Sequence, residues 1–314
     1  MLKRSVPAVD RALHPHHGVT RLGQPLSYNR VPAPDLQPWV AYLYVTEVEV
    51  PEGYSLQCGL LNDLAAVRIQ TRGQWTAQTR DGQLALGCSA VYFGPHSKAM
   101  AIGVSGSFSS IGLLLRPGAG YAMTGRSAAD FTDRAMQLDP AFYPVEETLA
   151  RLDAAKDPEA QVLIMEDVIR RVLAHTKALP PDPVSARFEA LAYSDPNASV
   201  AEFAKTCGIG ERQLERIIRR DFGMSPKKVL RRARALDMAS YLRGVADEEE
   251  AGELELRYYD QSHLIREFSQ LFGMSPRQFV SRPQPLMTIA LESRQGCRLA
   301  MMERLKPGVP RPWE

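Results

Sequence analysis

SVAEFAKTCGIGERQLERIIRRDFGMSP, residues 199–226, is the stretch that decides the fold, because its pattern predicts two helices joined by a tight turn. Apolar residues recur at steps of three and four on either side of Gly208, which is the spacing of amphipathic helices. The second helix should bury one apolar stripe, which consists of Leu214, Ile217, Ile218 and Phe222. Its other face carries arginines, and an arginine-bearing helix after a tight turn is what a helix-turn-helix places in the major groove of DNA.

The pentapeptide FGMSP occurs twice, at Phe222–Pro226 and at Phe272–Pro276. Glycine just after a helix adopts the left-handed conformation that ends it, and Ser-Pro is a common start for the next helix. The repeat therefore predicts two helix ends of the same design, each preceded by a candidate recognition helix. The basic segment from Pro226 to Arg243 should be a helix that links the two units.

The first half of the chain has the composition of β-structure. Between Trp39 and Leu115, runs of β-branched and aromatic residues alternate with turn signals at Arg72-Gly73 and Asp81-Gly82. Several short strands separated by such turns predict a sandwich or a barrel.

Helices should follow the strands. We expect one helix over 145–155 and a second over 157–175, capped by Asp157 and with Pro158 at its first position. The segment ALPPDP, residues 178–183, cannot continue a helix, so it suggests a domain boundary. The fold class predicted for the 314 residues is α+β: a β-rich regulatory or dimerisation domain with C-terminal helices (1–177), a linker (178–186), an all-α domain of two helix-turn-helix units (187–281) and a C-terminal extension (282–314).

Charge is distributed unevenly along the chain. The net charge is only +2, but residues 212–234 hold nine Lys/Arg against two acids, a balance of +7. Residues 247–260 hold seven acids against one Arg, a balance of −6. A concentrated basic segment is typical of nucleic-acid binding, although the exposed face of any helix can be equally basic.

Several other classes of function find no support in the sequence. The four cysteines are far apart and contain no C-x-x-C pair, so we expect buried thiols and no disulfide framework. The histidines of HPHH (residues 14–17) and His96 lack the surrounding ligands of a metal site, and no nucleotide-binding or hydrolase motif occurs, so we expect no metal, no cofactor and no enzyme. No apolar run is long enough to span a membrane, which predicts a cytoplasmic protein without membrane association.

Residues 201–242 and the segment YYDQSHLIREFSQLFGMSPRQF, residues 258–279, together resemble the AraC/XylS family of bacterial transcription regulators. The resemblance implies two helix-turn-helix units whose recognition helices, at about 211–221 and 260–270, enter adjacent major-groove segments of double-stranded DNA. It leaves open whether the chain activates or represses, and whether it contacts RNA polymerase, a small-molecule effector or a second copy of itself. The segment IGLLLRPGAGYAMTGRSAADFTDRAMQLD, residues 111–139, is similar to one type of regulatory domain found in this family.

The resemblance also implies roles for individual residues. Base-facing positions of the first recognition helix correspond to Arg212, Glu215 and Arg216, and those of the second to Gln261, Ser262 and Arg266. Phosphate contacts or flanking positions correspond to Arg219, Arg220, Lys227 and His263. Phosphate contacts set affinity and its salt dependence, whereas base contacts set sequence preference.

Two alternatives stay open. The segment ADEEEAGELELRYYDQSH, residues 246–263, has no glycine where the second unit should turn, so the second unit could be degenerate and the protein a weakly specific DNA binder or a non-catalytic interaction protein. A more remote alternative is a regulator of the DNA repair methyltransferase type, which would need a reactive cysteine in a Pro-Cys-His-Arg setting. Cys297 lies in GCRL and lacks that setting.

Overall fold

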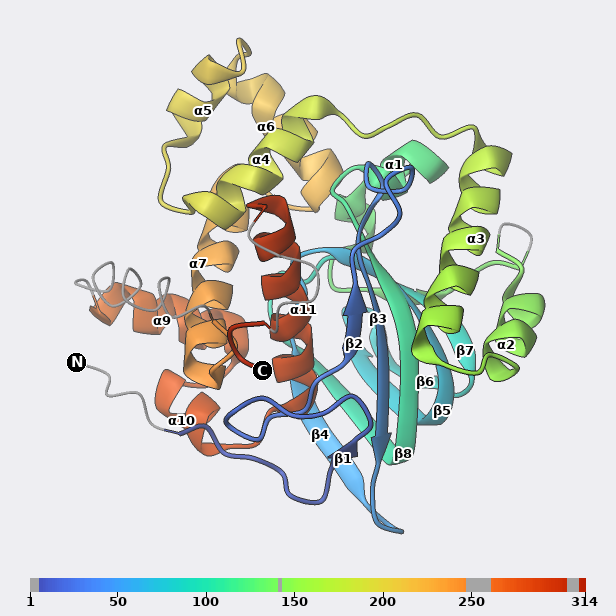
Figure 1. The fold of residues 1–314 in the computed structure, drawn as a ribbon. Helices are drawn as coiled ribbons and strands as arrows, with labels where there is room; N and C mark the ends of the chain where they lie inside the picture. The colour runs from blue at the N-terminus through green and yellow to red at the C-terminus, as the bar shows by residue number, and fades with distance from the viewer. Residues whose placement is uncertain (1–5, 141–142, 247–260, 304–310) are drawn as a thin grey trace.

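The computed structural model describes residues 6–140, 143–246, 261–303 and 311–314. A β-sheet forms the first part of the chain and a group of helices forms the second, which confirms the predicted α+β class. The sheet lies between α2 and α3 on one side and α7 and α11 on the other (Figure 1). Within the described residues, no helix is both long enough and apolar enough to cross a membrane.

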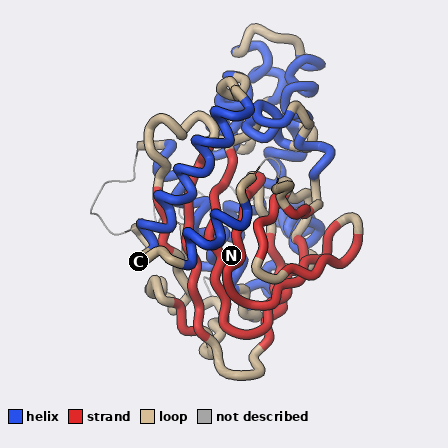
Figure 2. Tube along the Cα trace, turned by 90° about the vertical axis from the view of Figure 1, so that its right-hand side faces the viewer, coloured by secondary structure: helices blue, strands red, loops and turns tan. Residues whose placement is uncertain are grey.

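The described strands belong to one antiparallel sheet with the central order β1-β3-β8-β5-β7-β9. They are β1 (His14–Pro15), β2 (Tyr28–Arg30), β3 (Val40–Glu49), β4 (Ser55–Leu60), β5 (Ala65–Thr79), β6 (Gly82–Leu86), β7 (Ser89–Phe93), β8 (Met100–Leu115) and β9 (Ala135–Gln137). In Figure 2 the strands form one curved layer, and many of the helices gather at one end of it. The β-rich first half is therefore confirmed, with its strands joined in one hydrogen-bonded sheet.

One of the two predicted turns is wrong. Asp81-Gly82 does connect β5 to β6, but β5 continues through Arg72-Gly73 without turning. The register of β5 against β8 shifts on both sides of Arg72, and Gly73 has a φ of +93°. Glycine with positive φ inside a strand is typical of a β-bulge, which bends a long strand without ending it. A Cβ on Gly73 would lie 2.9 Å from the Cβ of Phe108, so this bulge also requires a residue without a side chain.

The helices of the first half cover one face of the sheet. They are α1 (Ala119–Thr124), the 3-10 helix η1 (Ala128–Phe131), α2 (Val145–Asp153) and α3 (Pro158–Thr176). As predicted, the Asp157 carboxylate caps α3 by accepting from the Ala160 N–H at 2.8 Å. Buried residues of α3 such as Met165 and Ile169 share a core with Val67 of β5 and other sheet residues.

The helices of the second half are α4 (Pro183–Ser194), α5 (Val200–Thr206), α6 (Glu211–Phe222), α7 (Pro226–Arg243), α9 (Gln261–Phe272), α10 (Pro276–Ser281) and α11 (Pro285–Met301). Both FGMSP copies end a helix as predicted, because Gly223 and Gly273 have φ values of +78° and +67°. Pro226 and Pro276 occupy the first turns of α7 and α10. The two starts differ in one respect, since Ser275 forms a capping box whereas the Ser225 side chain makes no capping hydrogen bond.

The C-terminal extension contributes a helix that joins the two halves. Nearly all of α11 is buried, and it packs against β4 and β3 of the sheet and against α7. One hydrophobic core contains Leu286 and Leu291 of α11, Leu56 of β4, Leu236 of α7 and Phe268 of α9. The sheet and the second helix-turn-helix unit therefore share a core.

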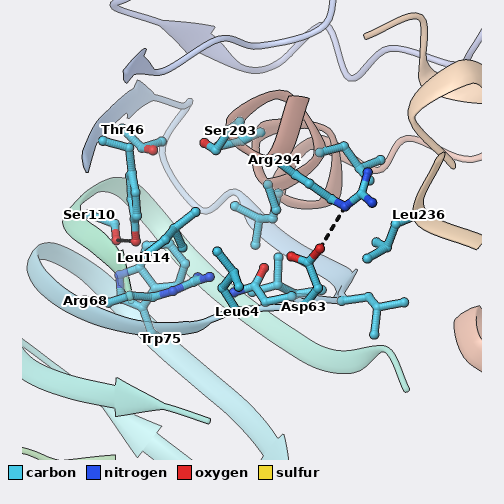
Figure 3. Close-up of a pocket in the computed structure, with 18 residues that line it drawn as sticks. Thr46, Asp63, Leu64, Arg68, Trp75, Ser110, Leu114, Leu236, Ser293 and Arg294 are labelled. Carbon is cyan, nitrogen blue, oxygen red and sulfur yellow. Dashed lines mark hydrogen bonds and ion pairs between the residues drawn. The ribbon is translucent and has the colours of Figure 1, made fainter. Parts of the chain in front are cut away.

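Ion pairs and buried hydrogen bonds reinforce this junction, and Figure 3 shows the pair between Arg294 and Asp63. The Arg294 guanidinium of α11 donates to the Asp63 carboxylate at 2.8 Å and to the Asp237 carboxylate of α7 at 2.7 Å. Arg232 of α7 donates to the backbone carbonyls of His96 and Asp63 at 2.8 and 2.9 Å. Removing one partner of such a buried pair leaves an uncompensated charge, which makes the junction costly to open.

Candidate DNA interface

The first helix-turn-helix unit consists of α5 and α6. The Ser199 hydroxyl caps α5 by accepting from the Glu202 N–H at 3.3 Å, and Gly208 takes a φ of +68° in the turn before α6. The predicted apolar stripe of α6 is buried, and Phe222 stacks edge-on against Phe188 of α4 with ring centroids 5.6 Å apart. These contacts fix the orientation of α6, and hence the direction in which its polar face points.

The polar face of α6 is open to solvent. Its exposed residues Arg212, Glu215, Arg216 and Arg219 border one shallow surface hollow, as predicted for one face of a helix. Glu215 and Arg219 form an ion pair at 3.1 Å, one helical turn apart. In the described part of the chain, no carboxylate lies within ion-pair distance of Arg212 or Arg216, so both guanidinium groups have their donors available.

Arg220 borders the same hollow, but its guanidinium already has partners within the protein. Its guanidinium donates to the Asp221 carboxylate at 2.6 and 2.7 Å and to the Asp182 carboxylate at 3.3 Å, and it lies 4.5 Å from the ring centroid of Tyr121 in α1. The hydrogen bond to Asp221 is the main reason why the pKa of Arg220 is raised. Arg220 therefore borders the same hollow as the exposed residues of α6, while its guanidinium connects the end of α6 to Asp182 and to Tyr121 of the first half of the chain.

The end of α6 has further contacts with the first half that the sequence did not reveal. The Ser127 hydroxyl donates to the Arg220 carbonyl at 3.3 Å, and the Thr132 hydroxyl donates to the Gly223 carbonyl at 3.1 Å. The partners are about ninety residues apart in the chain. No local pattern could have indicated them, because Ser and Thr in a loop satisfy many different acceptors.

The second unit is described in part. On α9, Arg266 is exposed, whereas Gln261, Ser262 and His263 lie in the first turn, where the side chains are outside the described residues. The buried Glu267 pairs with Arg231 and Arg234 of α7 at 2.9 and 3.4 Å, which orients α9 on the linker helix. The acidic segment 247–257 also lies outside the described residues. Lys227 is exposed at the start of α7.

Cysteines and histidines were expected to play no metal-binding or catalytic role. The four thiols were also expected to be buried. Cys58 and Cys297 are buried and Cys207 is partly buried, but Cys88 is exposed, so the predicted burial is wrong for Cys88. Burial raises the pKa of the Cys58 thiol to about 11. His16 and His17 lie near the carboxylates of Glu47 and Glu49 at 3.4 to 3.8 Å.

Two parts of the chain match known families. Residues 203–282 match a family described as a helix-turn-helix domain, and residues 28–137 match a domain of unknown function (DUF6597). No curated protein sequence matches the chain. The helix-turn-helix match and the exposed face of α6 define a DNA-binding transcription regulator. This helix-turn-helix domain is of the AraC type, in agreement with the resemblance of the sequence to the AraC/XylS family.

Solved structures of two regulators are similar to this chain. Apo ToxT from Vibrio cholerae has 9% identity and a TM-score of 0.45, covering 76% of this chain and 96% of that chain. Wild-type ToxT bound to an unsaturated fatty acid has 10% identity and a TM-score of 0.44, covering 76% and 94%. The AraC-like transcriptional activator CuxR has 13% identity and a TM-score of 0.29, covering 67% and 86%.

Proposed function

We propose that the protein regulates transcription by reading a specific double-stranded DNA site with α6 and α9, which enter adjacent major-groove segments on one face of the duplex. The observation that carries this proposal is the exposed face of α6, where Arg212 and Arg216 are free of carboxylate partners among the described residues. A guanidinium with unengaged donors can form two hydrogen bonds to guanine at once. An arginine already held by an acid would have to break that contact first.

The roles proposed on α6 agree with the exposure of its side chains, and those proposed on α9 rest on the resemblance to the AraC/XylS family. On α6, Arg212, Glu215 and Arg216 contact base edges, and Arg219 contacts phosphate or flanks the bases. On α9, Gln261, Ser262 and Arg266 contact bases, with His263 beside the backbone. Lys227 contacts phosphate from the start of α7, where its side chain is exposed. Arg220, the remaining candidate, couples α6 to the first half of the chain through Asp182 and Tyr121.

The first half of the chain serves as the regulatory domain, which responds to an effector or forms a dimer. Its direct contact with the end of α6 supports this assignment, because a change in α1 or η1 would reach a DNA-reading helix without an intermediate. The protein acts on DNA in the cytoplasm and carries out no catalysis of its own. The polar face of α6 is better suited to contact bases and phosphates than to bind an apolar protein surface.

The test begins with selection of genomic DNA fragments by the purified full-length protein, which yields a consensus site. Fluorescence anisotropy with that site then compares wild type with Arg216→Ala, which we expect to weaken specific binding by about 1–3 kcal/mol and to relax preference at one base position. The matched control is Arg80→Ala, an exposed arginine between β5 and β6 on the sheet. Unchanged affinity and unchanged sequence preference for Arg216→Ala would refute the assignment of α6 to the groove.

A further inference from the structure

A cavity of about 420 Å³ lies between the sheet and the helices α1, α3 and η1. Its walls are mainly apolar and include Leu113 of β8 and Ile169 of α3. Five aromatic rings from separate parts of the chain also line it: Tyr92, Tyr121, Phe131, Tyr143 and Phe222. Well-packed cores leave few voids larger than a water molecule, whereas ligand pockets fall within 300–1,000 Å³ by order of magnitude, roughly the size seen here.

Large apolar side chains at the rim of this cavity are exposed. Tyr121 of α1 has 39% of its surface exposed, and Met136 of β9 has 41%. Leaving such side chains in water costs free energy that an apolar ligand would recover on binding. The cavity is therefore accessible, and its entrance is as apolar as its interior.

Charged groups around the cavity leave one cation unpaired. Asp63 pairs with Arg294, and the Asp221 carboxylate pairs with Arg220. The third lining acid, Asp139, also has a partner, and the lining Arg116 pairs with Glu189 at 2.9 Å. The Arg126 guanidinium lies over the Phe131 ring, 4.5 Å from its centroid, and no carboxylate of the described residues pairs with it. An anionic group on a bound molecule would find its partner there.

The cavity also touches the first DNA-reading helix. Arg220, Asp221 and Phe222, the last residues of α6, form part of its wall. Tyr121 also lines the cavity, and its ring lies 4.5 Å from the Arg220 guanidinium. The Ser185 hydroxyl donates to the Asp221 carboxylate at 2.6 Å, so the same wall is tied to α4. A molecule that displaces Tyr121 would therefore disturb the contacts that hold the end of α6.

We propose that this cavity is an effector site for an apolar small molecule that contains an aromatic ring and one anionic group. The anionic group pairs with Arg126, and occupancy of the cavity alters DNA binding through Tyr121 and Arg220. This inference rests on the proposed function, because it names the effector class and the route by which it acts. Binding to the cavity can be measured without DNA, so the two proposals fail separately.

Two fluorescent probes test the site directly. They are 1-anilinonaphthalene-8-sulfonate and its uncharged analogue N-phenyl-1-naphthylamine, which share a ring system and differ in the sulfonate. Both should bind wild type at one site per chain, and Val172→Phe, which adds bulk to the cavity wall on α3, should weaken both by about tenfold or more. The matched control is Leu163→Phe on the same helix, where the native side chain is 50% exposed and outside the cavity, and it should leave both affinities unchanged.

Further variants separate the parts of the proposal. Met123→Trp fills the cavity from α1 and should also weaken both probes by about tenfold or more. It therefore tests the site even if Val172→Phe fails to fold. Arg126→Ala should weaken the sulfonate probe by about tenfold and leave the uncharged probe unchanged. Undiminished probe binding by both cavity-filling variants would overturn the site. Equal losses for the two probes in Arg126→Ala would overturn the anionic group.

The link to DNA is measured by anisotropy with and without a saturating concentration of the sulfonate probe. The probe should change the Kd for DNA by about fivefold or more in wild type, because coupled sites shift each other's affinity reciprocally. It should have no effect in Val172→Phe. An unchanged Kd in probe-saturated wild type would overturn the coupling, whereas a protein that binds no specific DNA in the absence of probe would instead refute the proposed function.

Discussion

His96 is a buried histidine whose environment allows only its neutral form. It is fully buried, its Nδ1 lies 2.8 Å from the Leu60 carbonyl oxygen, and Arg232 donates to its own carbonyl. Burial is the largest cause that lowers the pKa of His96, to about 4, with smaller contributions from Arg68 and Arg232. A ring without charge can serve as part of the junction between the sheet and α7, where a second cation beside Arg232 would be repelled.

This lowered pKa predicts a loss of stability in mild acid. Below its ordinary pKa of 6.5, His96 takes up a proton in the unfolded chain but not in the folded protein until the pH approaches about 4. The folded state should therefore lose about 2 kcal/mol from this group between about pH 7.5 and about pH 5. Urea unfolding at the two pH values should show a smaller loss for His96→Gln than for wild type.

The control for His96 is His14→Gln, which replaces an exposed histidine of β1 and should keep the pH dependence of wild type. If His96→Gln loses as much stability on acidification as wild type does, His96 is not the group responsible. The neighbouring acids contribute in both proteins, so the comparison isolates the histidine.

At the scale of elements, the two FGMSP copies offer a matched pair. Gly223 and Gly273 both end a recognition helix with positive φ, so alanine at either should cost about 1–2 kcal/mol. Their surroundings differ. A Cβ on Gly223 would lie 2.3 Å from the Thr132 Oγ1 of the regulatory domain, whereas nothing lies within 4 Å of a Cβ on Gly273. Gly223→Ala should therefore destabilise the protein by about 1–3 kcal/mol more than Gly273→Ala does.

Chemical denaturation of both variants measures this difference. The double variant Gly223→Ala/Thr132→Ala, which removes the nearest clashing atom, should recover part of the extra loss. Equal destabilisation by the two glycine substitutions would mean that α6 does not pack closely against η1. The repeated pentapeptide would then have one structural role at both positions instead of an additional contact at the first.

Elements with local causes could be predicted from the sequence. The start of α3 at Asp157-Pro158 and both glycine helix ends follow from residues adjacent to them. The bulge at Gly73 could not be predicted, because glycine favours a turn and a bulge equally and the choice depends on the pairing of β5 with β8. The contacts of Arg220 with Asp182 and Tyr121 could not be predicted either, because these residues are distant from it in sequence.

At the scale of the whole molecule, the chain differs from two modules on a tether. Residues 177–182 separate α3 from α4, so α4 begins inside the predicted linker 178–186, and Leu179 is 78% exposed. Yet α11, which follows the predicted DNA-binding region, completes a core with the sheet on one side and α7, α9 and α10 on the other. Burying apolar surface from both halves in one core makes their relative position part of the folded state. The first half of the chain therefore holds a fixed position against α6.

Cleavage of the linker tests this arrangement. A specific protease site introduced at residues 178–180 should allow complete cutting, because the segment is exposed and makes few contacts. The two fragments should nevertheless elute together in size-exclusion chromatography, since the shared core and the pair between Arg294 and Asp63, which lie on different fragments, stay intact. Asp63→Ala removes the acid that the first fragment offers to Arg294, a change of about 1.5–3 kcal/mol, so the cut variant should separate at lower urea concentrations. Separation of the cut wild-type fragments without denaturant would show that the halves are independent, and that the contacts of α6 with Ser127 and Thr132 cannot hold a fixed geometry.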